Sequence, residues 1–207
     1  MIDMRERARL LLMAVIFVAV PAAGVEWRSV GPDGGTVTAI AAATSERMLL
    51  AGTAEGLLFR SVDRAQTWER VGASLGGHQV LQIVINPKNA ARVWVRTDLG
   101  IFRSSDRGNS FLQRLAGNVS QFAVAPANPD VVYASIFSVG SNELLKSTDG
   151  GATWAVPANA GLGIVPISVA VDAADPSIVY VAGYSILAGP SPSLSSLWRS
   201  VDGGATW

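Results

Sequence analysis

Cysteine is absent from this sequence of 207 residues, and histidine occurs once, at His78. The absence of cysteine excludes disulfide bonds, thiolate metal sites and a cysteine nucleophile. A single histidine excludes metal sites built from several histidines. Acidic and basic side chains balance at 16 each, so the chain lacks the basic surface that nucleic acids require. We therefore predict no cofactor, no metal site and no nucleic-acid partner.

Long hydrophobic runs are also rare, with one exception near the N-terminus. Arg5, Arg7 and Arg9 precede an apolar run over residues 10–20, and small residues follow at Ala22–Gly24. A membrane-spanning helix needs roughly 20 apolar residues, which this run does not reach. The pattern predicts a signal peptide over residues 1–24, cleaved near Ala22–Gly24, in preference to an uncleaved anchor. The mature chain, residues 25–207, would then be secreted or periplasmic, with no membrane span.

An eight-residue pattern occurs four times in this mature chain. Its copies begin at Ser61, Ser104, Ser147 and Ser200, at spacings of 43, 43 and 53 residues. Near-constant spacing of this length is typical of repeat architectures in which each repeat is one supersecondary unit. The repeated positions are Ser61, Asp63, Thr67 and Trp68; Ser104, Asp106, Gly108, Ser110 and Phe111; Ser147, Asp149, Gly151, Thr153 and Trp154; and Ser200, Asp202, Gly204, Thr206 and Trp207.

The segments between the copies repeat as well. Each unit begins with an apolar run, a short polar turn and a second, β-rich run. After a hairpin comes a third run that ends in an aromatic residue or leucine and is followed by a basic residue and the pattern's serine. A fourth run begins inside the pattern. The first runs are Val37–Ala43, Val80–Ile85, Phe122–Ala125 and Ile167–Val171, and the second runs are Met48–Thr53, Arg92–Thr97, Val131–Ile136 and Ile178–Tyr184. Four short strands in about 43 residues, without a helical period, predict an all-β fold in which each unit is one blade of a β-propeller. The predicted units span about 25–74, 75–117, 118–160 and 161–207.

The repeated pattern has the chemistry of a turn. A serine followed two residues later by an aspartate can bond the backbone amides of its own loop. Gly108, Gly151 and Gly204 stand where the chain would need a positive φ, which glycine adopts with little strain. The first copy has Ala65 at this position, so its turn is expected to be slightly strained. The terminal Trp or Phe offers a large flat surface to bury between neighbouring blades.

This pattern, S-x-D-x-G-x-T-W, resembles the Asp-box (BNR) repeat of sialidases, sortilin-type receptors, xyloglucanases and photosystem II assembly factor-like propellers. The resemblance extends over the whole mature chain, although Ala65, Ser110 and Phe111 depart from the consensus. It implies four-stranded antiparallel blades with Asp-box turns on the periphery, where the aspartates are structural and not catalytic. The basic residues before the repeats are likewise expected to serve packing or pairing near the turn acids; they are Arg60, Arg103, Lys146 and Arg199.

Four units form an incomplete ring by this resemblance, because Asp-box propellers usually have more blades. Residues 26–30 resemble an outer strand without its own blade, since Trp27–Val30 matches Trp68–Val71 in pattern. Our hypothesis is that this segment completes the final blade and latches the ring. A closed ring of four blades is the alternative.

A ligand site should use loop residues that differ between blades, because residues shared by every blade are architectural. Glu55 and Asp98 occupy equivalent hairpin positions, each six residues before its pattern serine. Two carboxylates at a channel could act as acid and base in glycoside hydrolysis, and Arg96–Gly100 faintly resembles the catalytic hairpin of xyloglucanases. A plain turn residue is the alternative for Asp98. His78 could face the channel or be an ordinary loop residue. The long hairpin Tyr184–Ser196 could contact a partner or be a tolerated insertion.

Functionally, the sequence predicts an exported, non-enzymatic propeller that acts as a binding or scaffold module for a protein or carbohydrate ligand. In this interpretation no residue is catalytic. The alternative is a secreted glycoside hydrolase of the xyloglucanase or sialidase type, in which Asp98 and Glu55 are the candidate catalytic residues and others lie beyond residue 207. The sialidase version is disfavoured, because the sequence has no Arg-Ile-Pro motif.

Overall fold

The computed structural model describes residues 28–43, 46–138, 141–157, 164–185 and 195–207, so the predicted signal peptide lies outside the described residues. The described part is all-β, apart from short 3₁₀ turns such as η2 (Ala73–Leu75). It contains no helix of the length and hydropathy needed to cross a bilayer. The prediction of an all-β chain is confirmed.

The strands form four antiparallel sheets, one for each predicted unit, and we number these blades one to four. Blade one has β1 (Val37–Ala43), β2 (Met48–Thr53), β3 (Leu58–Ser61) and β4 (Glu69–Val71); blade two has β5 (Val80–Ile85), β6 (Val93–Thr97), β7 (Gly100–Ser104) and β8 (Leu112–Ala116); blade three has β9 (Val119–Val124), β10 (Val132–Ser138) and β11 (Ser141–Ser147); blade four has β12 (Ile164–Val171), β13 (Val179–Ser185) and β14 (Ser195–Ser200).

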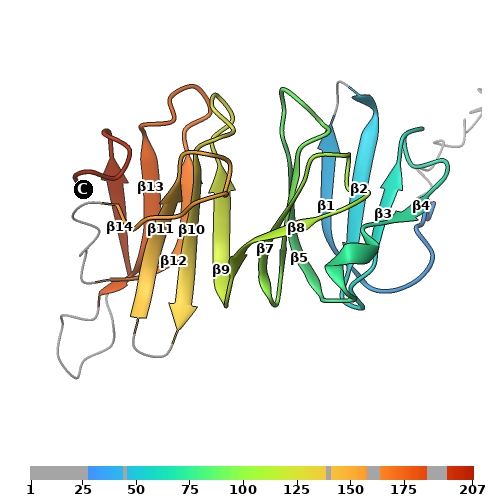
Figure 1. Cartoon of the computed structure of the whole chain (residues 1–207), viewed down its shortest axis with the longest axis horizontal. Helices are drawn as coiled ribbons and strands as arrows, with labels where there is room; N and C mark the ends of the chain where they lie inside the picture. Colours follow the sequence, from blue (N-terminus) through green and yellow to red (C-terminus); the bar gives the residue numbers. More distant parts are fainter. Residues whose placement is uncertain (1–27, 44–45, 139–140, 158–163, 186–194) are drawn as a thin grey trace, which may run out of the picture.

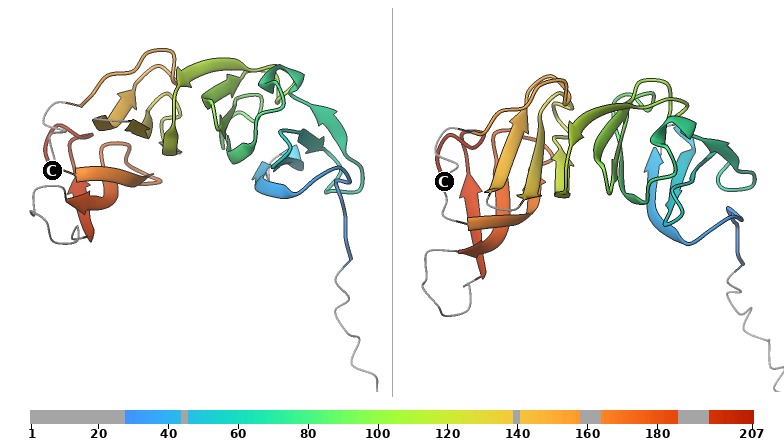
Figure 2. Two further views of the ribbon diagram at one scale, coloured as in Figure 1. Left: turned by 90° about the horizontal axis from the view of Figure 1, so that it is seen from below. Right: turned by 60° about the horizontal axis from the view of Figure 1, so that its bottom comes forward.

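The four blades follow one another along an arc (Figures 1 and 2). Within each blade the strands pair in chain order, with β1, β5, β9 and β12 as the first strands. The first strands of neighbouring blades meet, β1 against β5 and β9 against β12. Among the described strands, none of blade four pairs with blade one. The fold is therefore that of a β-propeller with an open ring, as predicted.

Blades one and two have the expected four strands, and three strands are described in each of blades three and four. In blade three, the described residues after Trp154 contribute a single bridge, between Ala155 and Lys146, in place of a fourth strand. Pro157 follows two residues later and has no N–H to donate to a ladder. In blade four, the sequence ends at Trp207. In blades one and two, the outer strands β4 and β8 begin directly after the equivalent residues Trp68 and Phe111.

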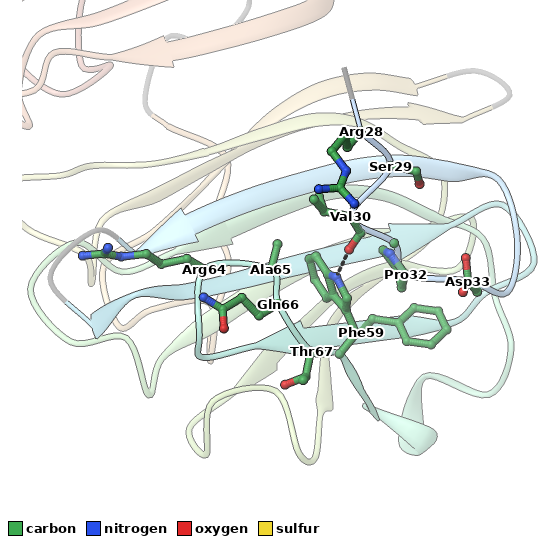
Figure 3. A pocket seen from close by; sticks show the side chains of 12 residues that line it. Arg28, Ser29, Val30, Pro32, Asp33, Phe59, Arg64, Ala65, Gln66 and Thr67 are labelled. Atoms are coloured by element: carbon green, nitrogen blue, oxygen red, sulfur yellow. Dashed lines mark hydrogen bonds between the residues drawn. The ribbon is translucent and has the colours of Figure 1, made fainter. Parts of the chain in front are cut away.

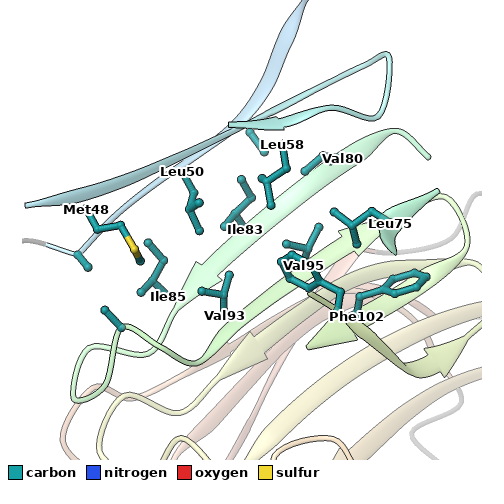
Figure 4. Close-up of a cluster of buried hydrophobic side chains, with 14 residues drawn as sticks. Met48, Leu50, Leu58, Leu75, Val80, Ile83, Ile85, Val93, Val95 and Phe102 are labelled. Carbon is teal, nitrogen blue, oxygen red and sulfur yellow. The ribbon is translucent and has the colours of Figure 1, made fainter. Parts of the chain in front are cut away.

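Hydrophobic side chains fill the spaces between successive blades. Leu50, Val80 and Val93 lie in the cluster between blades one and two (Figure 4). Trp94 and Phe122, both fully buried, lie in the cluster between blades two and three. Tyr133 and Val181 belong to the cluster between blades three and four. Because these side chains are buried only where two blades meet, one repeat alone would leave its hydrophobic faces in water.

The repeated turns come directly after the third strand of each blade, and their hydrogen bonds are nearly the same in all four copies. In the second copy the Ser104 hydroxyl donates to Asp106 (2.7 Å) and accepts the N–H of Gly108 (2.8 Å). The Asp106 carboxylate in turn accepts the N–H (2.9 Å) and the hydroxyl (2.6 Å) of Ser110. Each turn thus satisfies its own amides with its own side chains.

These hydrogen bonds hold the turn carboxylates in the ionised form. The Thr67 hydroxyl and N–H, together with Ser61, lower the pKa of Asp63 to about 2. At Asp106, desolvation favours the neutral form, but the hydroxyl and N–H of Ser110 outweigh it and lower the pKa to about 2. The carboxyl pKa values of Asp149 and Asp202 are lowered in the same way, chiefly by Thr153 and Thr206. A carboxylate engaged in this manner stabilises its turn and is poorly suited to proton transfer.

Backbone conformation accounts for the glycine of the pattern. Its position has a positive φ in every copy, 87° at Gly108, 90° at Gly151 and 92° at Gly204. Ala65 adopts a φ of 65° in the first copy, and its neighbour Arg64 has a φ of 63°. Residues with a Cβ are disfavoured in this region, so the first turn stores the strain expected from its sequence.

The segment Arg28–Val30 lies against the turn of blade one. The Trp68 indole N–H donates to the carbonyl of Val30 at 2.7 Å (Figure 3), as the Trp154 indole donates to the carbonyl of Arg114 at 2.9 Å. Arg114 belongs to β8, the outer strand of the blade that precedes Trp154. Relative to Trp68, Val30 therefore has the place of an outer strand of a preceding blade. Residues 26 and 27 of the predicted latch lie outside the described residues.

Candidate functional site at the hairpin end

The two ends of each blade carry different loops. The repeated turns lie at one end, which we call the turn end. The hairpins β2–β3 and β6–β7 and the β4–β5 connection lie at the other, which we call the hairpin end. Glu55, His78 and Asp98 are at the hairpin end, on loops that differ between blades.

Close packing of two glycines brings these loops together. A Cβ at Gly56, where φ is 77°, would lie 2.0 Å from the carbonyl carbon of Gly77 and 2.5 Å from the nitrogen of His78. Only glycine fits such an approach of backbone to backbone. The hairpin that carries Glu55 therefore rests directly on the connection that carries His78.

His78 also reaches the hairpin of blade two. Its Nδ1 lies 3.3 Å from Oδ1 of Asp98, and the two side chains are 36% and 53% exposed. A polar contact at this exposure contributes at most about 1 kcal/mol to stability. The contact thus orients Asp98 without burying it, and the carboxylate stays open to a ligand.

Glu55 has a different environment, although it occupies the equivalent hairpin position. Both of its carboxylate oxygens accept the N–H of Thr36, at 3.2 and 2.9 Å. The largest influence on its pKa is its own backbone N–H, which lowers it. Desolvation is second and raises the pKa, but the hydroxyl of Thr53 and the N–H of Thr36 lower it further, so the net shift is downward. Glu55 therefore holds Thr36, the residue directly before β1, in place through its carboxylate, which is ionised at neutral pH.

The structure places the three predicted residues at one end of neighbouring blades and joins two of them directly. One carboxylate, Asp98, is exposed beside an imidazole, and the other, Glu55, is held by backbone. Within the described ranges, no group of His, Asp and Glu side chains could hold a metal ion. The hairpin between β13 and β14, a predicted contact surface, lies mostly outside the described residues.

A cavity of about 460 Å³ lies along the first strands of blades two to four, and sequence reasoning did not find it. It lies where each first strand has a register shift, for example between Val80 and Gln82. The Arg96 guanidinium lines it and donates to the carbonyl of Val119 at 3.0 Å, and burial lowers the pKa of this arginine. Register shifts depend on pairing between strands, so no signal in the sequence marks this cavity. Its lining residues are Leu81, Gln82, Arg96, Ser120, Gln121, Ile167 and Ser168.

A larger cavity of about 850 Å³ lies at the free edge of blade one (Figure 3). Residues 28–33 form one wall, and Phe59 with residues 64–68 forms the other. It contains neither Glu55 nor Asp98.

Comparison with known proteins identifies relatives at low identity, and no family model matches the chain. The chain is 28% identical over 167 residues to a xyloglucanase of Hypocrea jecorina (strain QM6a), which covers 69% of the chain and 19% of that enzyme. It is 28% identical over 164 residues to a xyloglucanase of Paenibacillus sp., which covers 68% of the chain and 15% of that enzyme. The chain thus spans less than a fifth of the length of these curated relatives.

Solved structures agree on the architecture. A GH74 enzyme of Niastella koreensis superposes with a TM-score of 0.58 at 22% identity, covering 84% of this chain and 29% of the enzyme. YCF48 from Cyanidioschyzon merolae superposes with a TM-score of 0.55 at 15% identity, covering 82% of this chain and 59% of YCF48. Likeness at this identity concerns the fold alone. The predicted propeller is confirmed by these neighbours.

Proposed function

We propose that this chain is part of a glycoside hydrolase that acts on a β-glucan-type polysaccharide, and that Asp98 is one of its catalytic carboxylates. The proposal replaces the non-enzymatic role that the sequence favoured. The observation that carries it is the similarity to two xyloglucanases, which extends over 69% and 68% of the chain. A continuous stretch of that length includes Asp98 wherever it begins, since Asp98 lies near the middle of the 207 residues.

The geometry of Asp98 supports this role. A catalytic base in an inverting glycosidase must reach a water beside the sugar, and a nucleophile in a retaining enzyme must reach the anomeric carbon. Asp98 lies at the tip of the β6–β7 hairpin with half of its side chain exposed, and His78 fixes its orientation from the neighbouring loop. Glu55 suits a positioning role better, because both of its oxygens are bonded to Thr36.

The reaction requires a second carboxyl group, which must be protonated when it serves as the acid. The two groups must lie roughly 5–10 Å apart across the scissile bond. Glu55 has a lowered pKa and would be deprotonated, so it does not fit the acid. We infer that the acid comes from another part of the protein. This is compatible with the comparison, because the chain spans only 19% and 15% of the length of the two xyloglucanases.

The test is an assay of the protein expressed from the complete reading frame that contains these residues, on xyloglucan and other polysaccharides. Asp98→Asn should lower kcat by about 10²–10⁴-fold without changing the unfolding midpoint. Glu69→Gln is a matched control, because Glu69 is an exposed acid of the outer strand β4 and pairs with Arg60. Turnover that survives Asp98→Asn would contradict the assignment.

A binding module without catalysis is the second candidate, and the backbone-bound state of Glu55 favours it. Calorimetry with xyloglucan oligosaccharides separates the two candidates. Binding without release of reducing ends would support the module and would overturn the proposed hydrolase.

A further inference from the structure

The first strands of blades two, three and four each carry one extra residue near the hairpin end. In β5, for example, the register with β6 passes from Val80 to Gln82. The residues that the register passes over are Leu81, Ser120 and Ile167. An extra residue of this kind leaves the ladder, which re-aims its side chain. All three residues line the cavity of about 460 Å³, so this cavity is built by the register of the strands.

Arg96 reaches the cavity from the second strand of blade two, and it is the only charged residue that lines it. Its guanidinium donates to the carbonyl of Val119 in the next blade at 3.0 Å. Among the described residues, no carboxylate lies within salt-bridge distance of Arg96, whereas Arg92, directly before the same strand, pairs with Asp130 at 2.6 Å. The part of the chain that the structure describes therefore does not neutralise the charge of Arg96.

Burial makes this unpaired state unfavourable. It lowers the pKa of both Arg96 and Arg103, but at Arg103 the carboxylates of Asp130 and Asp149 offset part of the effect. A guanidinium has five N–H donors in a planar fork, and the Nε of Arg96 is buried without an acceptor. A cation that is partly removed from water and has unused donors is stabilised by an anion beside it.

The neutral polar side chains of the lining are of two kinds. Gln82 is occupied, because its amide nitrogen donates to the carbonyl of Phe122 at 2.9 Å and its amide oxygen accepts the N–H of the same residue at 3.5 Å. The side chains of Ser120, Gln121 and Ser168 have no hydrogen-bond partner within the described ranges. Gln82 thus joins blades two and three, while the other three side chains are free to bond the hydroxyl groups of a ligand.

The lining specifies both the charge and the polarity of a ligand. One guanidinium neutralises one negative charge and matches a carboxylate through paired hydrogen bonds. A phosphate monoester carries nearly two charges at neutral pH, and the lining residues include no second cation. A neutral sugar would leave the guanidinium without its anion. Leu81 and Ile167 add apolar contacts for the C–H groups of a ring, and the volume is typical of small-molecule sites.

We propose that this cavity binds a uronic acid, a sugar whose carboxylate pairs with Arg96 and whose hydroxyl groups bond to Ser120, Gln121 and Ser168. Asp98, the proposed catalytic carboxylate, is not among the lining residues and contacts His78 instead. The binding site therefore does not depend on the proposed hydrolysis. If both hold, the substrate class narrows to polysaccharides that carry uronic acid residues.

The experiment measures the binding of glucuronate, by isothermal titration calorimetry, to the protein expressed from the complete reading frame. Glucose is the neutral counterpart, and acetate has the carboxylate without the ring. Glucuronate should bind at least about tenfold more tightly than either, because it alone uses the guanidinium and the hydroxyl groups together. Arg96→Gln should weaken glucuronate binding by about tenfold or more. Arg70→Gln is the matched control, since Arg70 is an exposed arginine of β4 outside the cavity, and it should leave the affinity unchanged.

Two further variants decide the matter if Arg96→Gln does not fold, because Arg96 also bonds to Val119 of the next blade. Arg96→Lys keeps the positive charge without the planar fork and should weaken glucuronate binding less than glutamine does. Ser168→Ala should weaken glucuronate binding by about threefold or more and leave acetate binding unchanged. Equal effects of Ser168→Ala on both ligands would refute the assignment of the hydroxyl contacts.

Equal affinity for glucose and glucuronate would overturn the proposal, as would the absence of glucuronate binding. Tighter binding of acetate or inorganic phosphate than of glucuronate would also overturn it, by indicating a site for simple anions. A loss in Arg70→Gln as large as that in Arg96→Gln would show that binding follows net charge alone. Asp98→Asn separates this inference from the proposed hydrolase, because it should stop turnover and leave glucuronate binding unchanged. Turnover without glucuronate binding would refute the uronic acid site and leave the proposed function intact.

Discussion

The turn end and the hairpin end of the same blades follow opposite rules. At the turn end, Ser104 and Asp106 make bonds that recur in every copy. In the turns of blades two to four, the carbonyl of the residue after the aspartate also accepts a hydrogen bond from the preceding blade. At the hairpin end, equivalent positions have diverged, since Glu55 is bound to backbone and Asp98 is bound to His78. The difference teaches that repetition marks the scaffold and that divergence between blades marks where a ligand can be recognised. Substitutions at the two ends should therefore separate stability from function.

The largest effect is expected from the aromatic side chains that link blades at the turn end. Trp94→Ala removes a fully buried ring and its bond to Gly150, so it should lower the free energy of unfolding by about 3–5 kcal/mol. The control is Phe137→Ala near the hairpin end, where the ring is 45% exposed, with an expected loss below about 1 kcal/mol. Urea unfolding followed by circular dichroism measures both. If the two substitutions lowered the free energy of unfolding equally, the turn end would not be the more important end for stability.

A smaller loss is expected from the polar scaffold of one turn. Ser104→Ala leaves the buried N–H of Gly108 without its acceptor, at a cost of about 1–3 kcal/mol. Asp98→Ala at the hairpin end should change stability by no more than about 0.5 kcal/mol. The comparison uses the same denaturation assay, and a destabilisation by Asp98→Ala as large as that by Ser104→Ala would argue against a ligand role.

Acid should weaken the turn end selectively. The pKa values of Asp63 and Asp106 are lowered to about 2, so the unfolded chain binds more protons than the folded chain below the ordinary carboxyl pKa. The stabilisation is present above about pH 4 and is lost as the pH falls towards 2. Urea midpoints measured from pH 7 to pH 2 should decline in this window. Asp106→Asn should flatten the decline.

The smallest effect should come from the exposed pair at the hairpin end. His78→Ala should alter stability by less than about 1 kcal/mol, because both partners are well hydrated. In the assay of the complete protein, the same substitution should reduce turnover less than Asp98→Asn does. A loss of turnover as large as that of Asp98→Asn would assign His78 a direct part in the chemistry.

Local chemistry allowed much of the turn end to be predicted from the sequence. The alternating and continuous β-rich runs predicted β1, β2 and β5 with the bounds that the structure has. The demand for a positive φ at Gly108 was predictable because serine, aspartate and glycine act within eight residues of each other. Among its described residues, blade three has a single bridge at Ala155 in place of a fourth strand, which was not anticipated, although Pro157 is a local reason for it.

By itself, the sequence determined the number of repeats, the all-β class and the turn chemistry, because each depends on residues close together in the chain. Only the tertiary structure decided that Glu55 is bound by Thr36, that His78 meets Asp98, and that the basic residues reach the next blade's turn. These contacts join residues about 20 to 60 positions apart, through loop packing and strand register that no local pattern encodes. The same distinction explains why the turn scaffold could be predicted from one repeat, whereas the contacts between blades could not.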